Sequence, residues 1–467
     1  MQDLFDDTIC APATARGGAI AVIRVSGPEA LSCVDAVFHG RAPLAAAPGY
    51  SLHYGEIREA DGTSLDDVVV SVFRAPHSYT GENAAEIACH GSDYIVSRIL
   101  SLLLENGAKM AVPGEFTRRS YLHGKMDLSQ AEAVADLIAA QTAASHRIAH
   151  RQLKGGFSDE LAAMRAELLH IASLMELELD FSEEDVAFAD RGQLRQLVEN
   201  VLSHCEKLIE SFNLGNAIKN GVPVTIVGNT NSGKSTLLNA LLGEERAIVS
   251  DIAGTTRDTV EETLNLDGVL FRFIDTAGLR ESNDAIERIG IGRTYEKLAA
   301  AQLVLAVLDL SVPMPELLAS AQDIADRLSD GQQLFFLLNK ADTAPAETAA
   351  AVSDALSPLL SANRRILVIS AKRRTGLDEL RQRLADTWRS LETAAETTLV
   401  TNTRHLEALR NAATSLHRVK DGLDTPVPTD LLAQDLREAL YHLGTISGEV
   451  SNDEILGNIF SKFCIGK

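Results

Sequence analysis

The chain has 467 residues, of which 45% are hydrophobic and 23% charged, a composition typical of globular proteins with several domains. Its 43 basic and 65 acidic side chains give a formal net charge of -22, so the chain as a whole repels polyphosphates. A role on RNA therefore requires a local basic patch or a basic partner. Five scattered cysteines, an acidic start and the lack of a membrane-length apolar run favour a cytoplasmic protein with reduced thiols that does not associate with membranes.

Residues 1–120 mix short apolar runs with one helical pattern. The stretches "GAIAVIRVSG" and "DDVVVSVFRAP" predict buried strands. The stretch "SDYIVSRILSLLLENG" predicts a helix that ends at Gly107. Together they indicate an α+β domain at the N-terminus.

Residues 121–216 carry apolar side chains at helical spacing with few Pro or Gly residues. The stretches "LSQAEAVADLIAAQTAA", "ELAAMRAELLHIASLMELELD" and "RGQLRQLVENVLSHCEKLIESF" predict long amphipathic helices. Residues 389–467 return to the same pattern in "TRHLEALRNAATSLHRVKDG" and "TDLLAQDLREALYHLG". Residues 217–388 between them alternate strands with helices, which predicts a parallel α/β domain inserted into a split helical domain.

The stretch Gly228–Ser235, "GNTNSGKS", fits the G-x-x-x-x-G-K-[ST] phosphate loop and lies between the predicted strand "PVTIVG" and the predicted helix "STLLNALLG". In such a loop the backbone N–H groups surround phosphates and the following helix adds its dipole. Lys234 can reach the β and γ phosphates, and Ser235 can ligate Mg²⁺. This loop is the strongest chemical signal in the chain.

Further nucleotide signals follow in order, each at the end of a predicted strand. "FRFIDTAG" leads into Asp275–Gly278, suited to the Mg²⁺ shell and the γ-phosphate. "LFFLLNKAD" leads to Asp342, whose carboxylate can accept from guanine N1–H and N2–H₂, and "RILVIS" leads to a loop at Ser370–Lys372 suited to guanine O6. Thr255 and Thr256 in "AGTTRD" are candidate switch ligands. The set resembles the GTPase superfamily.

One expected group is missing after the D-x-x-G element. Ras-like GTPases orient the attacking water with a Gln at the position that Leu279 occupies here. Nearby polar alternatives are Arg280, Glu281, Asp284 and Glu287. Spacing alone favours solvated loop charges over a catalytic role for each of them, so the water-positioning group stays open at this point.

The combination of motifs resembles the MnmE (TrmE) family of tRNA modification GTPases. The matching stretches are "GNTNSGKS", "DIAGTTRD", "DTAGLRES", "IERIGIGR", "PGEFTRRSYLHGKMDLSQAEA" and the terminal "FCIGK". The resemblance implies an N-terminal domain similar to tetrahydrofolate-binding domains (1–120), a discontinuous helical domain (121–216 and 389–467) and an inserted G domain (217–388). It also implies a homodimer that forms a heterotetramer with the flavoprotein MnmG (GidA) and modifies tRNA wobble uridine at C5.

The resemblance further assigns roles to individual residues, with GTP, Mg²⁺, K⁺ and 5-formyl- or 5,10-methylene-tetrahydrofolate as cofactors. Ser235 and Thr256 would ligate Mg²⁺, and Glu287 would position the hydrolytic water. Asn231, Ser250, Ile252 and Thr255 would coordinate a K⁺ that acts in place of an arginine finger. The residues expected at the nucleotide are Asn231, Ser232, Gly233, Lys234, Ser235, Thr236, Ser250, Asp251, Ile252, Ala253, Gly254, Thr255, Thr256, Asp275, Thr276, Ala277, Gly278, Asn339, Lys340, Asp342, Ser370, Ala371 and Lys372.

The folate site is likewise implied by the resemblance. Arg24, Glu86, Lys125 and Lys467 match its residues, although each charge alone reads more simply as a surface group. Cys464 near the C-terminus fits a prenylation signal poorly because the last residue is Lys. The resemblance instead implies that the tail reaches the N-terminal domain, of the same chain or of a dimer partner, and makes Cys464 a candidate active-site thiol.

Three rival functions remain open for the sequence. A GTPase domain can belong to a ribosome-assembly switch, but that class usually adds a basic RNA-binding module. The chain can be a one-carbon transferase with a merely regulatory G domain, or a nucleotide-dependent scaffold. An assay of wobble-uridine modification with and without the flavoprotein separates these alternatives.

Overall fold

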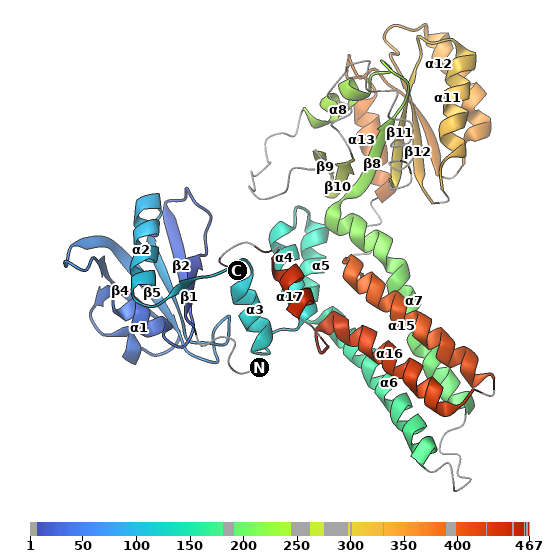
Figure 1. Ribbon diagram of the computed structural model, residues 1–467. Helices are drawn as coiled ribbons and strands as arrows, with labels where there is room; N and C mark the ends of the chain where they lie inside the picture. Colours follow the sequence, from blue (N-terminus) through green and yellow to red (C-terminus); the bar gives the residue numbers. More distant parts are fainter. Residues whose placement is uncertain are drawn as a thin grey trace. The chain divides into compact units, whose positions relative to one another are not determined.

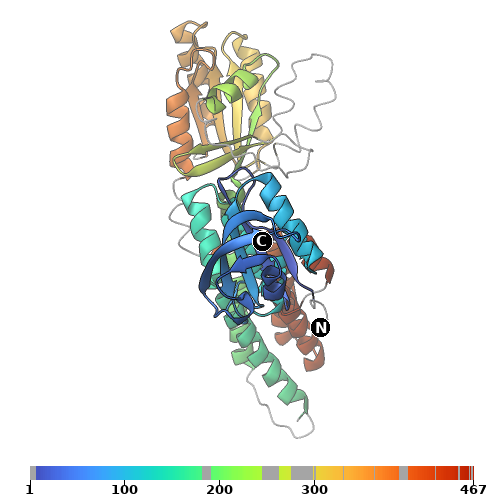
Figure 2. The same ribbon diagram turned by 90° about the vertical axis from the view of Figure 1, so that its left-hand side faces the viewer.

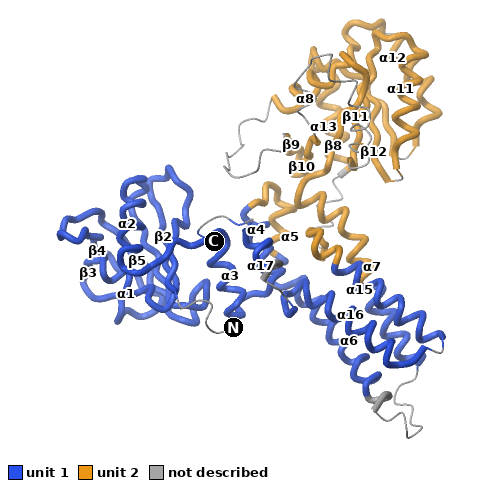
Figure 3. The backbone as a smooth tube through the Cα atoms, in the orientation of Figure 1, with its two compact units in different colours: residues 1–138, 151–203, 408–467 blue, residues 139–150, 204–407 orange. Residues whose placement is uncertain are grey.

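The structure of the chain is a computed structural model. It describes residues 7–180, 191–243, 262–274, 298, 301–329, 331–361, 363–388, 398–425, 427–450, 453–461, 463 and 466. The chain divides into two compact units, one made of residues 1–138, 151–203 and 408–467 and the other of residues 139–150 and 204–407 (Figure 3). Each unit contains parts of several of the four domains expected from the sequence, so those domain bounds stay a prediction.

The first unit contains a sheet of seven strands in the order β3-β4-β5-β6-β2-β1-β7. All neighbouring strands pair antiparallel except β1 and β7. The strands are β1 Ile9–Pro12, β2 Ile20–Ser26, β3 Phe38–Gly40, β4 Ser51–Arg58, β5 Ser64–Phe73, β6 Ala84–His90 and β7 Lys109–Met110. The two strands predicted in this region are therefore confirmed as β2 and β5.

Helices α1 (Ala30–Asp35) and α2 (Asp93–Glu105) pack on one face of this sheet (Figure 1). Alternate residues of the central strands, such as Ile23, Val70 and Ile87, point into that core and are fully buried. The predicted helix end at Gly107 is confirmed, since α2 ends at Glu105 and Gly107 has a φ of 98°. The residues that alternate with these along the strands, including Arg24 and Glu86, lie on the opposite face of the sheet.

The helical part of the chain follows the apolar spacing closely. Its helices are α3 Glu115–Leu122, α4 Leu128–Ala139, α5 Ala143–Leu153, α6 Gly156–Asp180, α7 Arg191–Asn220, α15 Thr403–Leu423, α16 Thr429–Ser447 and α17 Asp453–Phe460. Within the first unit, α6 and α16 lie side by side (Figures 1 and 2). None of the helices in the described ranges is long and apolar enough to cross a membrane.

One helix expected from the sequence is two helices. The pattern "LSQAEAVADLIAAQTAA" predicts continuity, but α4 ends at Ala139 and α5 begins at Ala143. The Thr142 N–H donates to Ser145 Oγ and the Ser145 N–H donates to Thr142 Oγ1, both at 3.1 Å. This reciprocal pair satisfies backbone donors that a continuous helix would satisfy internally, so it starts a new helix.

The second unit contains a sheet of six strands in the order β13-β12-β11-β8-β10-β9, parallel except for β9 beside β10. The strands are β8 Val222–Val227, β9 Glu262–Leu266, β10 Val269–Phe273, β11 Leu303–Asp309, β12 Gln333–Asn339 and β13 Arg364–Val368. The helices are α8 Lys234–Leu242, α11 Met314–Asp326, α12 Ala346–Leu356 and α13 Leu377–Trp388. The predicted parallel α/β domain is confirmed.

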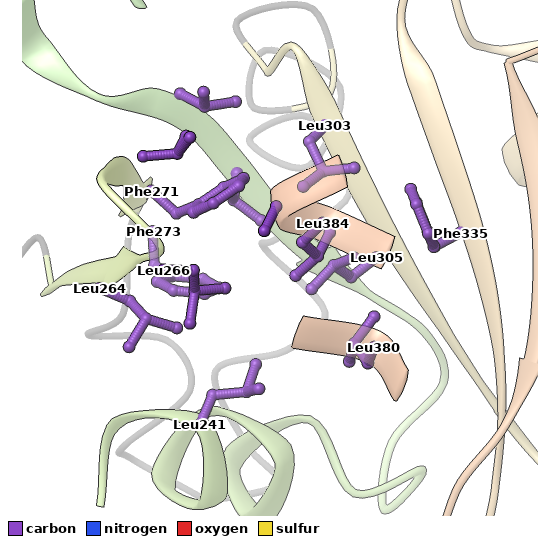
Figure 4. Packing of buried hydrophobic residues seen from close by; sticks show 14 of the residues in the cluster. Leu241, Leu264, Leu266, Phe271, Phe273, Leu303, Leu305, Phe335, Leu380 and Leu384 are labelled. Carbon is purple, nitrogen blue, oxygen red and sulfur yellow. The ribbon is translucent and has the colours of Figure 1, made fainter. Parts of the chain in front are cut away.

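Helices cover both faces of this sheet (Figures 1 and 2). Along β11, Leu303 and Leu305 face a core shared with α8, α13 and the β9–β10 hairpin, while Val304 and Ala306 face α11 and α12. Figure 4 shows the side chains of the first of these cores. Because both faces are buried, the parallel strands read as continuous apolar runs, and their carboxyl ends meet at one edge.

Candidate functional site

The phosphate loop Gly228–Ser235 connects β8 to α8 in the second unit. Gly228 and Gly233 have φ values of 145° and 99°, and Asn231 has a φ of 61°. A Cβ at Gly228 would lie 2.3 Å from the Val307 carbonyl oxygen, and one at Gly233 would lie 2.3 Å from Asn339 Nδ2. Both glycines are therefore required by close approaches as well as by their backbone conformation.

Lys234 and Ser235 stand at the first turn of α8. The Lys234 ammonium donates to the carbonyl oxygens of Gly228 and Asn229, both at 2.9 Å, which places its charge across the loop. Ser235 and Thr236 are exposed. A helix N-terminus, a glycine loop and a lysine in this arrangement suit an anionic phosphate, and an exposed Ser235 hydroxyl suits a hydrated Mg²⁺.

Asn339, the last residue of β12, connects this loop to a second one. Its side chain is 2% exposed. The Nδ2 group donates to the Ser232 carbonyl oxygen at 2.8 Å, and Oδ1 accepts from the Ala371 N–H at 3.0 Å. One amide therefore holds the phosphate loop and the loop after β13 at a fixed separation.

Asp342 and Ser370 also lie together, as their positions at neighbouring strand ends predict. The Ser370 hydroxyl donates to Asp342 Oδ1 at 2.6 Å and accepts from the Arg373 N–H at 3.1 Å. The hydrogen bond from Ser370 lowers the pKa of the Asp342 carboxyl, so it stays ionised near neutral pH. An ionised carboxylate is the acceptor that the guanine N1–H and N2–H₂ edge requires. Lys372 of the same loop is exposed.

The sequence interpretation missed Asp309 at the end of β11. The Lys340 ammonium, on a residue with a φ of 64°, lies 2.6 Å from Asp309 Oδ2. Burial opposes ionisation of Asp309, but hydrogen bonds from Lys340 and Ser311 outweigh it and lower its pKa. A carboxylate that directly follows "LVLAVL" could have been found by the same strand-end criterion as Asp342.

Several predicted site residues lie outside the residues that the structure describes. They are Ser250, Asp251, Ile252, Ala253, Gly254, Thr255, Thr256, Asp275, Thr276, Ala277, Gly278, Glu287, Cys464 and Lys467. The described part of the candidate nucleotide site consists of the phosphate loop, the loop after β12 that carries Asp342, and the loop after β13 that carries Ser370.

A second constellation lies in the first unit, on the sheet face opposite α1 and α2. Arg24 on β2 pairs in register with Glu86 on β6. The Arg24 Nε and Nη2 atoms lie 2.9 and 2.8 Å from Glu86 Oε1. The guanidinium also lies over the rings of Tyr79 and Phe116, with centroid distances of 5.2 and 5.6 Å. The site is thus a half-buried ion pair with aromatic walls.

The C-terminal tail reaches this site in the same chain. The Gly466 carbonyl oxygen accepts from Arg24 Nη1 at 3.4 Å. Gly466 has a φ of 96°, and a Cβ there would lie 2.0 Å from the Pro12 carbonyl oxygen on β1. Phe463 is buried and packs with Phe460 of α17. Lys125 contacts the same region less directly, since its ammonium donates to the Pro76 carbonyl oxygen at 3.1 Å in the loop that carries Tyr79.

A buried network, also missed from the sequence, supports this face. Arg119 on α3 is fully buried and forms ion pairs with Asp7, Glu82 and Glu115 at 2.7, 3.1 and 2.9 Å. Glu82 in turn accepts from the Ser26 hydroxyl at 2.7 Å, at the end of the strand that carries Arg24. "FTRRSYLHG" contains this arginine and Glu115 lies four residues before it, but Asp7 and Glu82 are too distant in sequence for spacing to reveal them.

Comparison with known proteins assigns almost the whole chain to one family. Residues 8–125 match the family described as the GTP-binding protein TrmE N-terminus, and residues 128–464 match the MnmE helical domain. A tRNA modification GTPase MnmE of Bacteroides thetaiotaomicron is 51% identical over 464 residues, 99% of each chain. The protein of the same name from Bacteroides fragilis is 50% identical over 465 residues, again 99% of each chain.

The chain belongs to the MnmE (TrmE) family. A solved GTP-binding protein of Sulfolobus solfataricus in complex with GDP is a distant likeness, with 21% identity, a TM-score of 0.29 and coverage of 49% of this chain and 67% of that chain. The family assignment depends on the sequence relatives alone.

The described residues fit the nucleotide that the relatives' name, a GTPase, implies. The Ser232 hydroxyl is buried without a hydrogen-bond partner among the described residues, inside a loop whose glycines leave space only for backbone. A GTP-type phosphate chain suits this cradle. For K⁺, the described part of the site offers the exposed Asn231, and the other expected ligands lie outside the described residues.

Four of the five cysteines lie in the described part of the chain. Cys10, Cys33, Cys89 and Cys205 are buried and free. Burial raises the pKa of Cys10 and Cys89 to about 11 and that of Cys205 to about 12. Since the thiolate is the reactive form, these cysteines are poor nucleophiles at neutral pH.

The Asn339 bridge is testable by removing its side chain. Asn339→Ala leaves the Ser232 carbonyl and the Ala371 N–H without their partner, so we expect the free energy of unfolding to fall by about 1–3 kcal/mol. Affinity for GDP should fall with it, because both loops lose their mutual restraint. Denaturant unfolding and titration with fluorescent GDP measure the two effects.

Asn220→Ala, which changes an exposed asparagine at the end of α7, serves as the control. Unchanged GDP affinity in Asn339→Ala would show that the bridge does not restrain the site.

Proposed function

We propose that the chain is a GTP hydrolase that acts in the modification of tRNA at the wobble uridine. The observation that carries this is the pair of loops held by Asn339, one suited to phosphates and one to guanine, within a chain of MnmE type. The relatives at 51% and 50% identity are named tRNA modification GTPases. The ribosome-assembly and scaffold alternatives give the Arg24–Glu86 constellation no role, and the transferase alternative gives the nucleotide site only a regulatory one.

In the proposed GTPase the described loops bind the nucleotide, and residues outside the described ranges complete the cation sites and position the water. The N–H groups of the phosphate loop and the Lys234 ammonium hold the phosphate chain, and Ser235 ligates a Mg²⁺ that neutralises charge on the phosphate oxygens. Asp342 selects guanine. Asn231 contributes to a K⁺ site with Ser250, Ile252 and Thr255, and Thr256 completes the Mg²⁺ shell. Glu287 positions the attacking water in place of the missing Gln.

The proposed roles of K⁺ and of Glu287 can be tested separately by measuring GTP turnover. We expect GTP turnover to be much faster in K⁺ than in Na⁺ buffer, because a fixed cation stabilises charge that develops in the transition state. Glu287→Ala should abolish turnover while GTP still binds, since the phosphate and guanine loops are intact. Phosphate release and nucleotide titration measure these effects, with the nearby Glu281→Ala as the matched control. Equal rates in the two buffers would reject the K⁺ role.

We further propose that Arg24 and Glu86 bind a tetrahydrofolate derivative that supplies the one-carbon unit. Both arginine contacts end on Glu86 Oε1, which leaves Oε2 to accept from the N–H donors of a pterin. The partly exposed Tyr79 offers an apolar surface for a flat ring, and the fully buried Phe116 supports the Arg24 guanidinium. Lys125 and Lys467 are the cations proposed for the acidic end of the ligand, and Cys464 remains the candidate thiol of the site.

Glu86→Gln tests the folate proposal separately from the GTPase. The amide keeps the size of the side chain but loses the charge, so we expect 5-formyl-tetrahydrofolate binding and tRNA modification with the flavoprotein to fall while GTP turnover persists. Calorimetry and nucleoside analysis of the tRNA are the measurements, and Cys464→Ser should likewise lose modification alone. Glu105→Gln on α2 is the matched control. Normal modification by Glu86→Gln would refute the folate role.

The homodimer and its assembly with the MnmG-type flavoprotein are also proposals. On the sheet face that bears Arg24, an apolar surface made of Ile20, Leu52, Tyr54 and Val69 is exposed, with fractions of 66%, 72%, 69% and 38%. Tyr54 and Val69 are partners in register, so this apolar surface is continuous across β4 and β5. Such a patch is typical of protein interfaces, and a second copy of the chain is the proposed occupant.

A charge placed on this surface should separate the two copies. We expect the double variant Leu52→Asp and Tyr54→Asp to have half the mass of the wild-type protein in light scattering, because burial of two carboxylates without partners is unfavourable. Tyr441→Asp, at a residue of α16 with 52% exposure, is the control and should leave the mass unchanged. A double variant with the wild-type mass would exclude this face as the dimer contact.

A further inference from the structure

Helix α5 (Ala143–Leu153) has one face that is entirely basic or neutral. Its exposed polar residues are His146, Arg147, His150 and Arg151, and the exposed Lys154 follows the end of the helix. At about 100° per residue, these side chains project within about 140° of the circumference. The residues on the opposite side, Ala144, Ser145, Ile148, Ala149 and Gln152, are buried.

The segment around α5 is positively charged, whereas the chain as a whole is negatively charged. Residues 137–158 contain no Asp or Glu, although the chain has 65 acidic residues and a net charge of -22. The rings of His146 and His150 stack one turn apart, with centroids 5.9 Å apart and planes at 17°. Arginines, a lysine and ring N–H donors therefore gather on a single surface, which we call the α5 basic face.

We infer that the α5 basic face contacts the phosphate backbone of the tRNA, an inference that rests on the proposed tRNA-modifying function. Guanidinium groups match phosphate oxygens with paired N–H donors, and Lys154 adds a point charge. Contacts of this kind position an RNA without reading its sequence. The face supplies the local basic patch that an acidic chain needs for this partner.

A protein partner fits the same face less well. Protein interfaces depend on a cluster of buried aromatic, apolar and arginine anchors, and this face offers only the arginines. The exposed large apolar residues of the described chain include none from 143 to 154. Arg147 and Arg151 also have interaction partners within the chain, so phosphate binding has to compete with those contacts.

The test removes the charge of the face and keeps the length of its side chains. The triple variant Arg147→Gln, Arg151→Gln and Lys154→Gln should raise the KM for tRNA about tenfold in the reconstituted modification reaction, with kcat unchanged. In direct binding of the full chain to an unmodified transcript with a wobble uridine, the slope of log affinity against log salt should fall by about 2.

The matched control carries Arg327→Gln, Arg383→Gln and Arg437→Gln. It loses the same charge at exposed ion pairs on other helices and should behave as wild type. Unfolding temperature confirms that both variants fold, and GTP turnover by the wild type tests the proposed function on its own. Unchanged tRNA affinity and KM in the triple variant would overturn the inference, and so would a loss of flavoprotein binding with tRNA affinity intact.

Discussion

The buried amide of Asn339 is the contact on which the nucleotide site depends. It stands at the end of β12, between the ends of β8 and β13, and it bonds to a loop on each side at 2.8 and 3.0 Å. Because the amide is buried, neither bond competes with water, and loss of either partner leaves a polar group unsatisfied. One side chain therefore sets the distance between the loop proposed for phosphates and the loop proposed for guanine, and Gly233 is restricted to glycine by the same contact.

The first unit also contains a close approach at a glycine that positions a polar contact. Gly466 passes so close to Pro12 that a side chain would not fit, and this approach brings its carbonyl oxygen to Arg24. Arg24 is in turn fixed by Glu86 and by two aromatic rings, and the Ser26, Glu82 and Arg119 network holds the strand end nearby. A glycine near the C-terminus and a strand of the N-terminal sheet thus meet at one ion pair.

Much of this architecture could be predicted from the sequence, for reasons visible in particular residues. The nucleotide motifs are local, each directly follows an apolar run, and parallel strands bring their ends to one edge, so Asn339, Asp342 and Ser370 could be placed together. Arg119 could not, since Asp7 and Glu82 are distant in sequence and no periodicity links them. The break at Thr142 escaped prediction because the apolar spacing continues through it, while the hydroxyl pair that starts α5 decides the outcome.

Net charge is a poor guide to the partners of this chain because electrostatics acts locally. At physiological salt the Debye length is about 8 Å, so acids farther than this from a basic surface scarcely weaken its field. The phosphate loop overcomes the overall charge of -22 with backbone N–H groups, a helix N-terminus and Lys234, all within a few residues. The α5 basic face does the same over one helix. An acidic chain can therefore bind both a nucleotide and an RNA backbone, provided that each anion meets donors within a Debye length, and the excess of carboxylates elsewhere then limits nonspecific binding of nucleic acid.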